Sequence, residues 1–333
     1  MKCIGKMQTV LPEFAEFEGQ EYRLEPGERQ VLMYIKEPSA GIGGNTGIIL
    51  LSHNWGGTWE LTRPWCDVIC DKFNLIAVSV NYLQSGWRAD KNTVPYDHGL
   101  LQAGDLLRAV WHIREYLAAE GAAWNPRRCY AAGASGGGNV SQMANKLAPH
   151  SFACVIDLCG MACLSDAIAF GEQRLNALYS RDPDSPYYLT PAMREIRDLG
   201  NMTHLARQFQ ANPANQVVIV HGLDDDYCPV TDKIAVFRNM IRAGFRPEGH
   251  FITPNQVDGI VVTTTGHQVG DRAYVIAHFG KDYLAERGEH IAQLREPGDF
   301  DRRHVVVYPV TGGEYRIDFG CGAPTIGFVP TGK

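Results

Sequence analysis

The segment YAAGASGGGN, residues 130–139, decides the fold that this sequence predicts. An apolar run typical of a buried strand ends at Ser135, and residues 137–149 are typical of a helix. Gly133 and Gly137 flank the serine in the pattern Gly-x-Ser-x-Gly, and such small neighbours permit a sharp turn between strand and helix. The turn exposes the hydroxyl beside the free N–H groups that begin the helix. We therefore predict a nucleophilic Ser135, with the amide of Gly136 able to bind an oxyanion.

Glycine-rich turns also serve as flexible linkers or phosphate cradles, and the context of Ser135 argues against both. A P-loop needs a Gly-Lys-Ser/Thr ending, but no lysine accompanies Gly136, Gly137 and Gly138. A dinucleotide-binding fingerprint needs Gly-x-Gly-x-x-Gly after the first strand of a βαβ unit, with an acid at the end of the next strand, and this arrangement is missing. The preceding strand and the following helix favour the nucleophile turn.

Apolar strands and amphipathic helices alternate along most of the chain. This alternation predicts an α/β fold, in which helices cover both faces of one mostly parallel sheet. No linker-like segment divides the sequence, so we expect a single domain over residues 1–333. Residues 20–38 also predict a β-hairpin around Pro26 and Gly27. The predicted strands lie within 46–57, 74–82, 127–135, 152–160 and 215–226, and the predicted helices within 62–73, 98–121, 137–149, 229–244 and 271–288.

Two stretches interrupt the alternation. Residues from about 161 to 212 are helical and polar, and we expect a cap insertion that covers the active site and shapes the access of substrate. Residues from about 289 to 333 contain β-like pieces at 304–310 and 314–319 among glycine-rich turns. They predict a short β-rich C-terminal extension of the same domain, for which the sequence offers no physical reason.

A nucleophilic serine needs a histidine base and an acid that orients it, both at strand ends on one side of the sheet. The strand within 215–226 ends in Asp224, Asp225 and Asp226, and His267 lies in a glycine-flanked loop after an extended run. The chain order serine, aspartate, histidine is that of the nucleophile-elbow hydrolases. Three adjacent carboxylates cannot all face one imidazole. We choose Asp225 as the acid, with Asp226 and Asp224 as alternatives.

The second oxyanion donor is expected in the loop that follows an earlier strand. In SHNWGG, residues 52–57, the glycines let the backbone approach a substrate carbonyl, and Trp55 is our choice of donor, with Asn54 as the alternative. Aromatic side chains near these loops are candidates for a substrate pocket, although most aromatic residues of such a chain pack in the core. The candidates are Trp55, Trp59, Tyr82, Trp87, Tyr187 and Tyr188.

We expect structural roles for two other histidines and for the cysteines. His221 and His250 lie within or at the start of strands, where packing or a strand-end hydrogen bond is expected. The nine cysteines are odd in number and lie mostly in apolar runs, which indicates buried free thiols in a reducing compartment. Cys66 and Cys70 have no second pair at ligand spacing, so no zinc site is expected.

Four of these motifs together resemble the α/β-hydrolase superfamily, over roughly residues 20–288. In the acid turns of esterases and prolyl-oligopeptidase-like peptidases an aspartate comes three residues after a glycine. In HGLDDDYCP, residues 221–229, this offset from Gly222 selects Asp225. The loop SHNWGG departs from the His-Gly-Gly-Gly loop of hormone-sensitive-lipase-like esterases and is similar to loops of the cutinase-like and dienelactone-hydrolase-like branches. The resemblance thus leaves the branch open. The motifs are GASGG at 133–137, SHNWGG at 52–57, HGLDDDYCP at 221–229 and TTGHQ at 264–268.

The resemblance implies acyl transfer through a Ser135–His267–Asp225 triad, with the amides of Gly136 and Trp55 as the oxyanion hole. Such chemistry needs no metal and no organic cofactor. The expected function is a carboxylic-ester hydrolase that acts on a small-molecule ester. One alternative is a serine peptidase or amidase of the prolyl-oligopeptidase type. The other is a hydrolase-fold protein that binds without catalysis, although such proteins often lose a triad member.

Composition excludes several other classes of protein. The net charge of −6 and the scattered basic residues argue against a nucleic-acid partner. No apolar run is long enough to span a membrane, and the first 19 residues lack the apolar core of a secretory signal. We therefore expect a soluble, cytoplasmic enzyme; the sequence is compatible with a homo-oligomer and does not define one.

Overall fold

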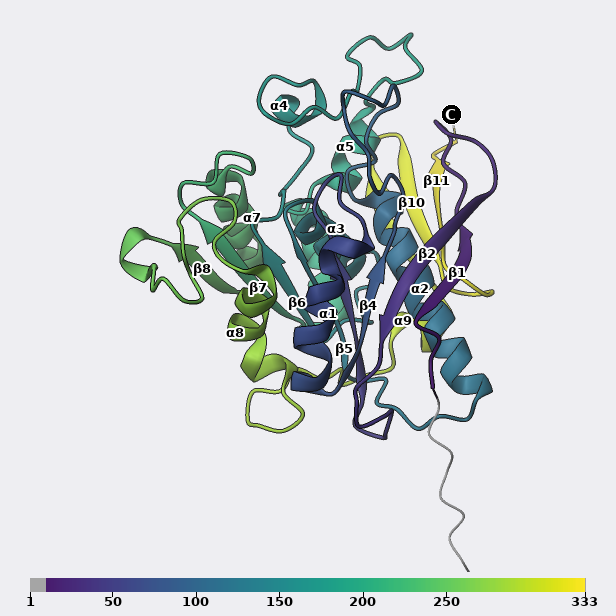
Figure 1. The fold of residues 1–333 in the computed structure, drawn as a ribbon. Helices are drawn as coiled ribbons and strands as arrows, with labels where there is room; N and C mark the ends of the chain where they lie inside the picture. The colour runs from purple at the N-terminus through teal and green to yellow at the C-terminus, as the bar shows by residue number, and fades with distance from the viewer. Residues whose placement is uncertain (1–9, 333) are drawn as a thin grey trace, which may run out of the picture.

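The computed structural model describes residues 10–332, and one eight-stranded sheet forms its centre (Figure 1). The strand order is β1-β2-β4-β3-β5-β6-β7-β8. All pairs from β4 through β8 are parallel, whereas β2 pairs antiparallel with both β1 and β4. The predicted mostly parallel sheet is therefore confirmed. The strands are β1 (Phe14–Gly19), β2 (Arg29–Lys36), β3 (Gly47–Ser52), β4 (Leu75–Val80), β5 (Cys129–Ala134), β6 (Cys154–Leu158), β7 (Gln216–Gly222) and β8 (Glu248–Ile252).

Helices cover both faces of the sheet, also as predicted. In β3, Ile48 and Leu50 belong to one hydrophobic cluster, while Ile49 and Leu51 belong to the other, because successive side chains of a strand point to opposite faces. Helices α1 and α8 pack on one face, and α2, α3, α6 and α7 pack on the other. These helices are α1 (Trp59–Phe73), α2 (Leu100–Ala119), α3 (Gly136–Leu147), α6 (Met202–Ala211), α7 (Val230–Ala243) and α8 (Arg272–Leu284).

The N-terminal hairpin is present but displaced along the sequence. Its first strand is β1, at Phe14–Gly19, rather than a strand within the predicted hairpin segment that begins at Gln20. The connection to β2 is accordingly long, and Tyr22 and Glu25 form an isolated bridge within it. Tyr22 is buried and donates its hydroxyl to Pro95 O at 2.9 Å, so tertiary contacts hold this connection in place.

The segment predicted as a cap has two parts. Helices α4 (Asp166–Ala169) and α5 (Pro191–Arg197) lie near the carboxyl ends of the strands (Figure 1). Helix α6 instead packs against α7 and α3 in the layer that covers the sheet. A third hydrophobic cluster joins the first part to the body, with Leu164, Ile168 and Leu189 packed beside Trp87 and Tyr96.

The C-terminal extension folds into a short helix and a second sheet. Strands β9 and β10 coincide with the two predicted β-like pieces, whereas β11 was not predicted. Tyr315, Ile317 and Ile326 join the larger hydrophobic cluster, so the extension shares the core of the main sheet. Within residues 10–332, no helix is long and apolar enough to cross a membrane. The elements are α9 (Asp299–Arg302), β9 (Val305–Val310), β10 (Gly313–Asp318) and β11 (Thr325–Pro330), in the antiparallel order β11-β10-β9.

Candidate active site

Ser135 lies in the turn between β5 and α3, with a strained backbone at φ 57° and ψ −121°. The turn is tight because its neighbours lack side chains. A Cβ on Gly133 would lie 2.2 Å from Gly137 O, and a Cβ on Gly137 would lie 2.0 Å from Ser52 O. Gly138 is also required, since its Cβ would lie 2.3 Å from Asp157 Oδ1. The local sequence therefore allows the sharp strand–turn–helix geometry that brings Ser135 to the edge of the sheet.

The candidate oxyanion donors lie against each other. A Cβ on Gly136 would lie 2.7 Å from Trp55 N, so the loop after β3 touches the first turn of α3. The Trp55 N–H donates to no group among residues 10–332. The Gly136 N–H begins α3, where amides have no intrahelical acceptor. Asn54, the alternative donor, uses its Nδ2 to bond Trp55 O at 3.3 Å. The arrangement favours the amides of Gly136 and Trp55.

The loop that carries Trp55 rests on a buried histidine. The His53 ring stacks on Tyr82 with 4.0 Å between ring centroids, and its Nε2 is 2.8 Å from Ser85 Oγ. Tyr82 donates its hydroxyl to His53 O. Burial lowers the pKa of His53 to about 4, so the imidazole stays neutral near pH 7. Tyr82, a predicted pocket residue, thus supports the loop from the core and has its hydroxyl occupied.

The candidate base and the candidate acid form a direct pair. His267 Nδ1 is 2.8 Å from Asp225 Oδ2 and 2.9 Å from Asp225 Oδ1. His267 lies in the loop between η1 (Pro254–Gln256) and α8. The two neighbouring aspartates face elsewhere: Asp224 accepts a hydrogen bond from Thr265, and Asp226 pairs with an arginine of the cap. Of the three candidate acids, only Asp225 contacts the imidazole.

A second histidine contacts the same carboxylate. His221 is buried at the end of β7, with Nε2 2.8 Å from Cys228 O and 3.2 Å from Asp225 Oδ2. Since both neighbours are acceptors, Nε2 carries the hydrogen. Burial alone would raise the pKa of Asp225, but hydrogen bonds from His221, His267 and the Cys228 amide lower it well below its ordinary value. The sequence predicted a strand-end hydrogen bond for His221 and missed that it reaches the acid.

Backbone hydrogen bonds bring these residues to one edge of the sheet. Ser135 N donates to Leu158 O at 2.8 Å, and Cys159 N donates to Val220 O at 2.8 Å, which ties together the carboxyl ends of β5, β6 and β7. Among residues 10–332, the Ser135 hydroxyl forms no hydrogen bond, including none to His267. Such a bond often tightens only when substrate binds.

Aromatic side chains line two sides of this region, and some of them differ from the predicted set. Trp55 stacks on Tyr96 with ring centroids 3.9 Å apart, and the buried Trp87 is 5.5 Å from Trp55. On the other side, the half-exposed Tyr227 ring lies 5.1 Å from the His267 ring. Sequence reasoning missed Tyr96 and Tyr227. The position of Tyr227, two residues after the acid, is the one signal that could have identified it.

The remaining predicted aromatic residues lie apart from this region. Trp59 begins α1 and stacks on Tyr34 of β2. Tyr188 lines a separate cavity, and Tyr187 bonds through its backbone to Ser180 and Ser185. The structure therefore does not bring Trp59, Tyr187 or Tyr188 together with the triad candidates.

Arg174, in the segment predicted as a cap, contacts the turn that contains Asp225. Arg174 forms an ion pair with Asp226, and its Cζ lies 4.3 Å from the centroid of the Tyr227 ring. Tyr227 in turn lies against His267. Arg174, Asp226 and Tyr227 thus form a chain of contacts from the cap to the base, and no sequence motif indicated it.

Three groups of side chains among the described residues could offer three ligand atoms to a metal ion. Two of them share Asp225, whose oxygens already accept hydrogen bonds from His267 and from the amides of Tyr227 and Cys228. Their geometry is explained by the pairing of acid and base. The third group joins His150, Asp299 and His304 where the C-terminal extension meets the body. Cys3 lies outside the described residues, and the other cysteines are free thiols.

Comparisons with known proteins match this chain in part by sequence and more widely by structure. The sequence profile of a family of proteins of unknown function, DUF2920, matches residues 173–315. This range contains Asp225 and His267 but not Ser135, and it covers less than half of the 333 residues. The comparison with curated proteins found no match.

Solved structures resemble the chain at low sequence identity. An acylaminoacyl peptidase from Pyrococcus horikoshii is 15% identical, with a TM-score of 0.54 over 83% of this chain and 42% of the peptidase. A protein described as a dipeptidyl aminopeptidase IV from Bacteroides ovatus is 16% identical, with a TM-score of 0.54 over 81% of this chain and 36% of that one. The esterase Est2 from Thermogutta terrifontis, with butyrate bound, is 14% identical, with a TM-score of 0.49 over 75% and 88%.

These likenesses concern the fold. The chain spans about two fifths of the length of the Pyrococcus peptidase that it matches. In this chain the fold consists of a mostly parallel sheet, helices on both of its faces and a sharp turn between β5 and α3. The chain has the α/β-hydrolase fold.

Proposed function

We propose that this protein is a serine hydrolase that cleaves a carboxylic ester of a small molecule. The observation that carries the proposal is the bonded pair of His267 and Asp225, at the same edge of the sheet as the strained turn of Ser135. The close approach of the Gly136 and Trp55 amides supports it, because an acyl-transfer site needs donors for the oxyanion.

In the proposed reaction, Ser135 Oγ attacks the substrate carbonyl while His267 Nε2 accepts the hydroxyl proton. Asp225 holds the imidazole by its Nδ1 and stabilises the positive charge that forms there. The N–H groups of Gly136 and Trp55 donate to the oxyanion. His267 then gives its proton to the leaving alcohol, which separates from the acyl-enzyme. Water, deprotonated by His267, releases the acid and restores Ser135.

The low pKa of Asp225 fits this role. An orienting acid must stay ionised while the imidazole alternates between its neutral and charged forms. Hydrogen bonds from His221 and the Cys228 amide keep the Asp225 carboxylate ionised at every pH at which a neutral imidazole can act as a base.

Amide cleavage by the same residues is the second candidate function. The similar structures from Pyrococcus horikoshii and Bacteroides ovatus are both described as peptidases, but at 15% and 16% identity the likeness concerns the fold alone. An amide demands more of the site than an ester, since the leaving amine must be protonated as the bond breaks. We keep the ester as the proposed substrate class.

A substrate panel separates the two functions. The panel pairs short-chain p-nitrophenyl esters with aminoacyl p-nitroanilides of matched size, and the Ser135→Ala variant is the control. We expect ester turnover that the control loses. If anilides are cleaved and esters are not, the peptidase function replaces ester hydrolysis as the proposal. If Ser135→Ala cleaves either substrate as fast as wild type, both proposals are contradicted.

A further inference from the structure

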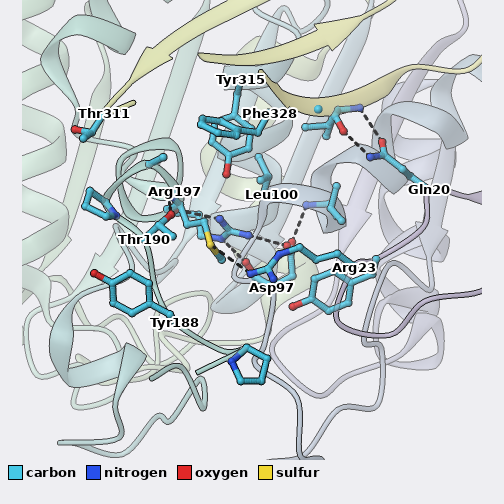
Figure 2. Close-up of a pocket in the computed structure, with 18 of the residues that line it drawn as sticks. Gln20, Arg23, Asp97, Leu100, Tyr188, Thr190, Arg197, Thr311, Tyr315 and Phe328 are labelled. Atoms are coloured by element: carbon cyan, nitrogen blue, oxygen red, sulfur yellow. Dashed lines mark hydrogen bonds and ion pairs between the residues drawn. The ribbon is translucent and has the colours of Figure 1, made fainter. Parts of the chain in front are cut away.

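A cavity of about 670 Å³ lies beside the C-terminal sheet and has no role in the proposed reaction. Four distant parts of the chain form its wall: the connection between β1 and β2, the start of α2, the cap before and within α5, and the C-terminal sheet (Figure 2). No triad or oxyanion residue lines it. Its volume lies within the range of about 300–1,000 Å³ that is typical of small-molecule sites.

A buried ion pair, Arg197 with Asp97, lines the cavity and is held by hydrogen bonds within the protein. Arg197 Nη2 is 2.9 Å from Asp97 Oδ1, and Arg197 Nε is 2.6 Å from Asp97 O. Arg197 Nη1 donates to Met193 O at 3.0 Å. Asp97 Oδ2 accepts from the amides of Leu101 and Gln102. These bonds use three of the five Arg197 N–H donors, and the charges of the pair balance each other.

Arg23 provides a cation that has no ion-pair partner among the described residues. Its guanidinium extends into the cavity toward Met193 (Figure 2), and its one hydrogen-bond contact among the described residues is Met193 Sδ at 3.6 Å. None of the described ion pairs includes Arg23 or the neighbouring Glu21, which also lines the cavity. A guanidinium presents five donors in a fork that fits a carboxylate. Arg23 is thus free to bind an anion.

The remaining walls suit an apolar body. Leu100, Ala192, Met193 and Ile326 supply aliphatic surface. The Tyr315 ring lies 5.3 Å from the Phe328 ring, and Tyr315 points from the C-terminal sheet toward Arg197 (Figure 2). Apolar walls with a few polar groups that fix orientation are the usual composition of a ligand site.

We propose that this cavity binds a small apolar carboxylate, with its carboxylate on Arg23 and its body against the C-terminal sheet. The site is distinct from the proposed catalytic centre. It also gives the C-terminal extension a physical purpose, since β10 and β11 supply one wall of it. One loop serves both regions, because Tyr96 stacks on Trp55 and the next residue, Asp97, lines the cavity.

Isothermal titration calorimetry of the full chain tests this proposal without any turnover. The probe is 4-phenylbutyrate, and 4-phenylbutanol is the uncharged match. Arg23 is exposed, and an exposed charge pair changes affinity at most about fivefold, so the carboxylate should bind about two- to fivefold more tightly than the alcohol.

Three variants locate the binding. Arg23→Gln should weaken 4-phenylbutyrate about two- to fivefold and leave 4-phenylbutanol unchanged. Phe328→Glu, on a half-exposed residue of β11 that lines the cavity, should weaken both probes by removing apolar wall, and the carboxylate more, because of repulsion. Arg88→Gln, on an exposed arginine paired with Asp90 outside the cavity, is the matched control and should change neither. Carboxylate binding that survives both Arg23→Gln and Phe328→Glu, or no saturable binding of either probe, would overturn the proposal.

Discussion

The turn of the proposed nucleophile Ser135 (the nucleophile turn) and the turn of its proposed acid Asp225 (the acid turn) lie at the same edge of the sheet. They are stabilised in different ways. Around Ser135, glycines bring backbone against backbone: Gly137 touches the end of β3, and Gly136 touches Trp55. Around Asp225, one carboxylate collects hydrogen bonds from His267, from His221 and from two amides. The first turn is therefore sensitive to added volume, and the second to changed charge.

The largest expected effect is the loss of the nucleophile turn by one methyl group. In Gly137→Ala, the new Cβ would lie 2.0 Å from Ser52 O and 2.5 Å from His53 O, and neither backbone can retreat. We expect a loss of unfolding free energy above about 4 kcal/mol, and little folded protein. Circular dichroism and thermal unfolding measure the effect. Gly43→Ala is the matched control, because a Cβ there meets nothing within 4 Å. Equal stability of the two variants would refute the steric account.

A substitution at Asp225 that keeps the size of the side chain should fit the acid turn. Loss of the negative charge should nevertheless abolish most of the activity. Asp225→Asn keeps the shape and leaves an amide that cannot hold the required tautomer, so kcat should fall roughly 10³- to 10⁴-fold in a variant that still folds but is less stable than wild type. Asp224→Asn and Asp226→Asn should each change kcat less than about fivefold, because their carboxylates face Thr265 and Arg174. Steady-state kinetics on the best ester decide the matter. A large loss in either neighbour, with Asp225→Asn active, would move the acid to another residue.

As the pH falls, the stabilisation that neutral His53 provides beside the nucleophile turn should be lost first. The stabilisation that ionised Asp225 provides in the acid turn should be lost only at lower pH. Burial lowers the pKa of His53 to about 4, so the unfolded chain takes up a proton below pH 6.5 that the folded chain refuses. The stability that His53 contributes is complete above pH 6.5 and is lost as the pH falls toward 4. Asp225 behaves differently: its lowered pKa stabilises the fold above about pH 4 and fails only below that value.

Urea unfolding at pH 7, 6 and 5 measures this dependence. Between pH 6 and 5, wild type should lose up to about 1.4 kcal/mol per pH unit more than His53→Gln. Asp225→Asn should show the wild-type slope in this range. A His53→Gln slope as steep as that of wild type would contradict the assignment.

His221 should have a smaller effect, exerted through the acid. We expect His221→Leu to lower kcat roughly tenfold, since a hydrogen bond to a charged group is lost, with KM little changed. The acid limb of the pH–rate profile should move to higher pH, because a carboxylate with one donor fewer attracts the proton of His267 more strongly. His221→Gln, which keeps a donor, should recover most of the rate. Loss of stability without any change in the pH profile would leave His221 a purely structural residue.

The smallest effect is expected at the contact between cap and acid turn. Arg174 and Asp226 are both more than half exposed, and such ion pairs contribute at most about 1 kcal/mol. Arg174→Gln should therefore raise KM roughly two- to fivefold and leave kcat near that of wild type. Arg181→Gln, on an exposed cap arginine paired with Asp166 and Glu172, is the matched control. A drop in kcat at Arg174→Gln would show that the contact positions Tyr227 and His267 instead.

Features that depend on local residue spacing could be predicted from the sequence. Most features that depend on contacts between distant residues could not. The fold followed from alternating apolar runs, and the turn at Ser135 from small residues at fixed spacing. The pairing of Asp225 with His267 joins residues 42 apart, yet strand ends, chain order and the offset of Asp225 from Gly222 in the resembling motif were enough to predict it. The need for glycine at position 138 was not evident from the sequence. It follows from the structure, because a Cβ there would clash with Asp157 of β6.

The misses share a cause. Tyr96 and Tyr227 reach the site through packing that no local spacing encodes. The predicted pocket residue Tyr82 is aromatic and close to the right loops in sequence, but its position after β4 buries it under His53. The hairpin was displaced because the connection around Tyr22 is held by the distant Pro95 rather than by its own turn. Burial and side-chain partners across the sheet decide such positions, and one sequence shows neither.

Covalent labelling tests the central claim, that Ser135 is a nucleophile activated by the His267–Asp225 pair. A fluorophosphonate should add to wild type at one site, and mass spectrometry of the peptide that contains Ser135 should carry the adduct. Ser135→Ala should not be labelled there, and His267→Ala should react at least about 100-fold more slowly. Labelling at another residue, or a rate that is unchanged in His267→Ala, would contradict the account.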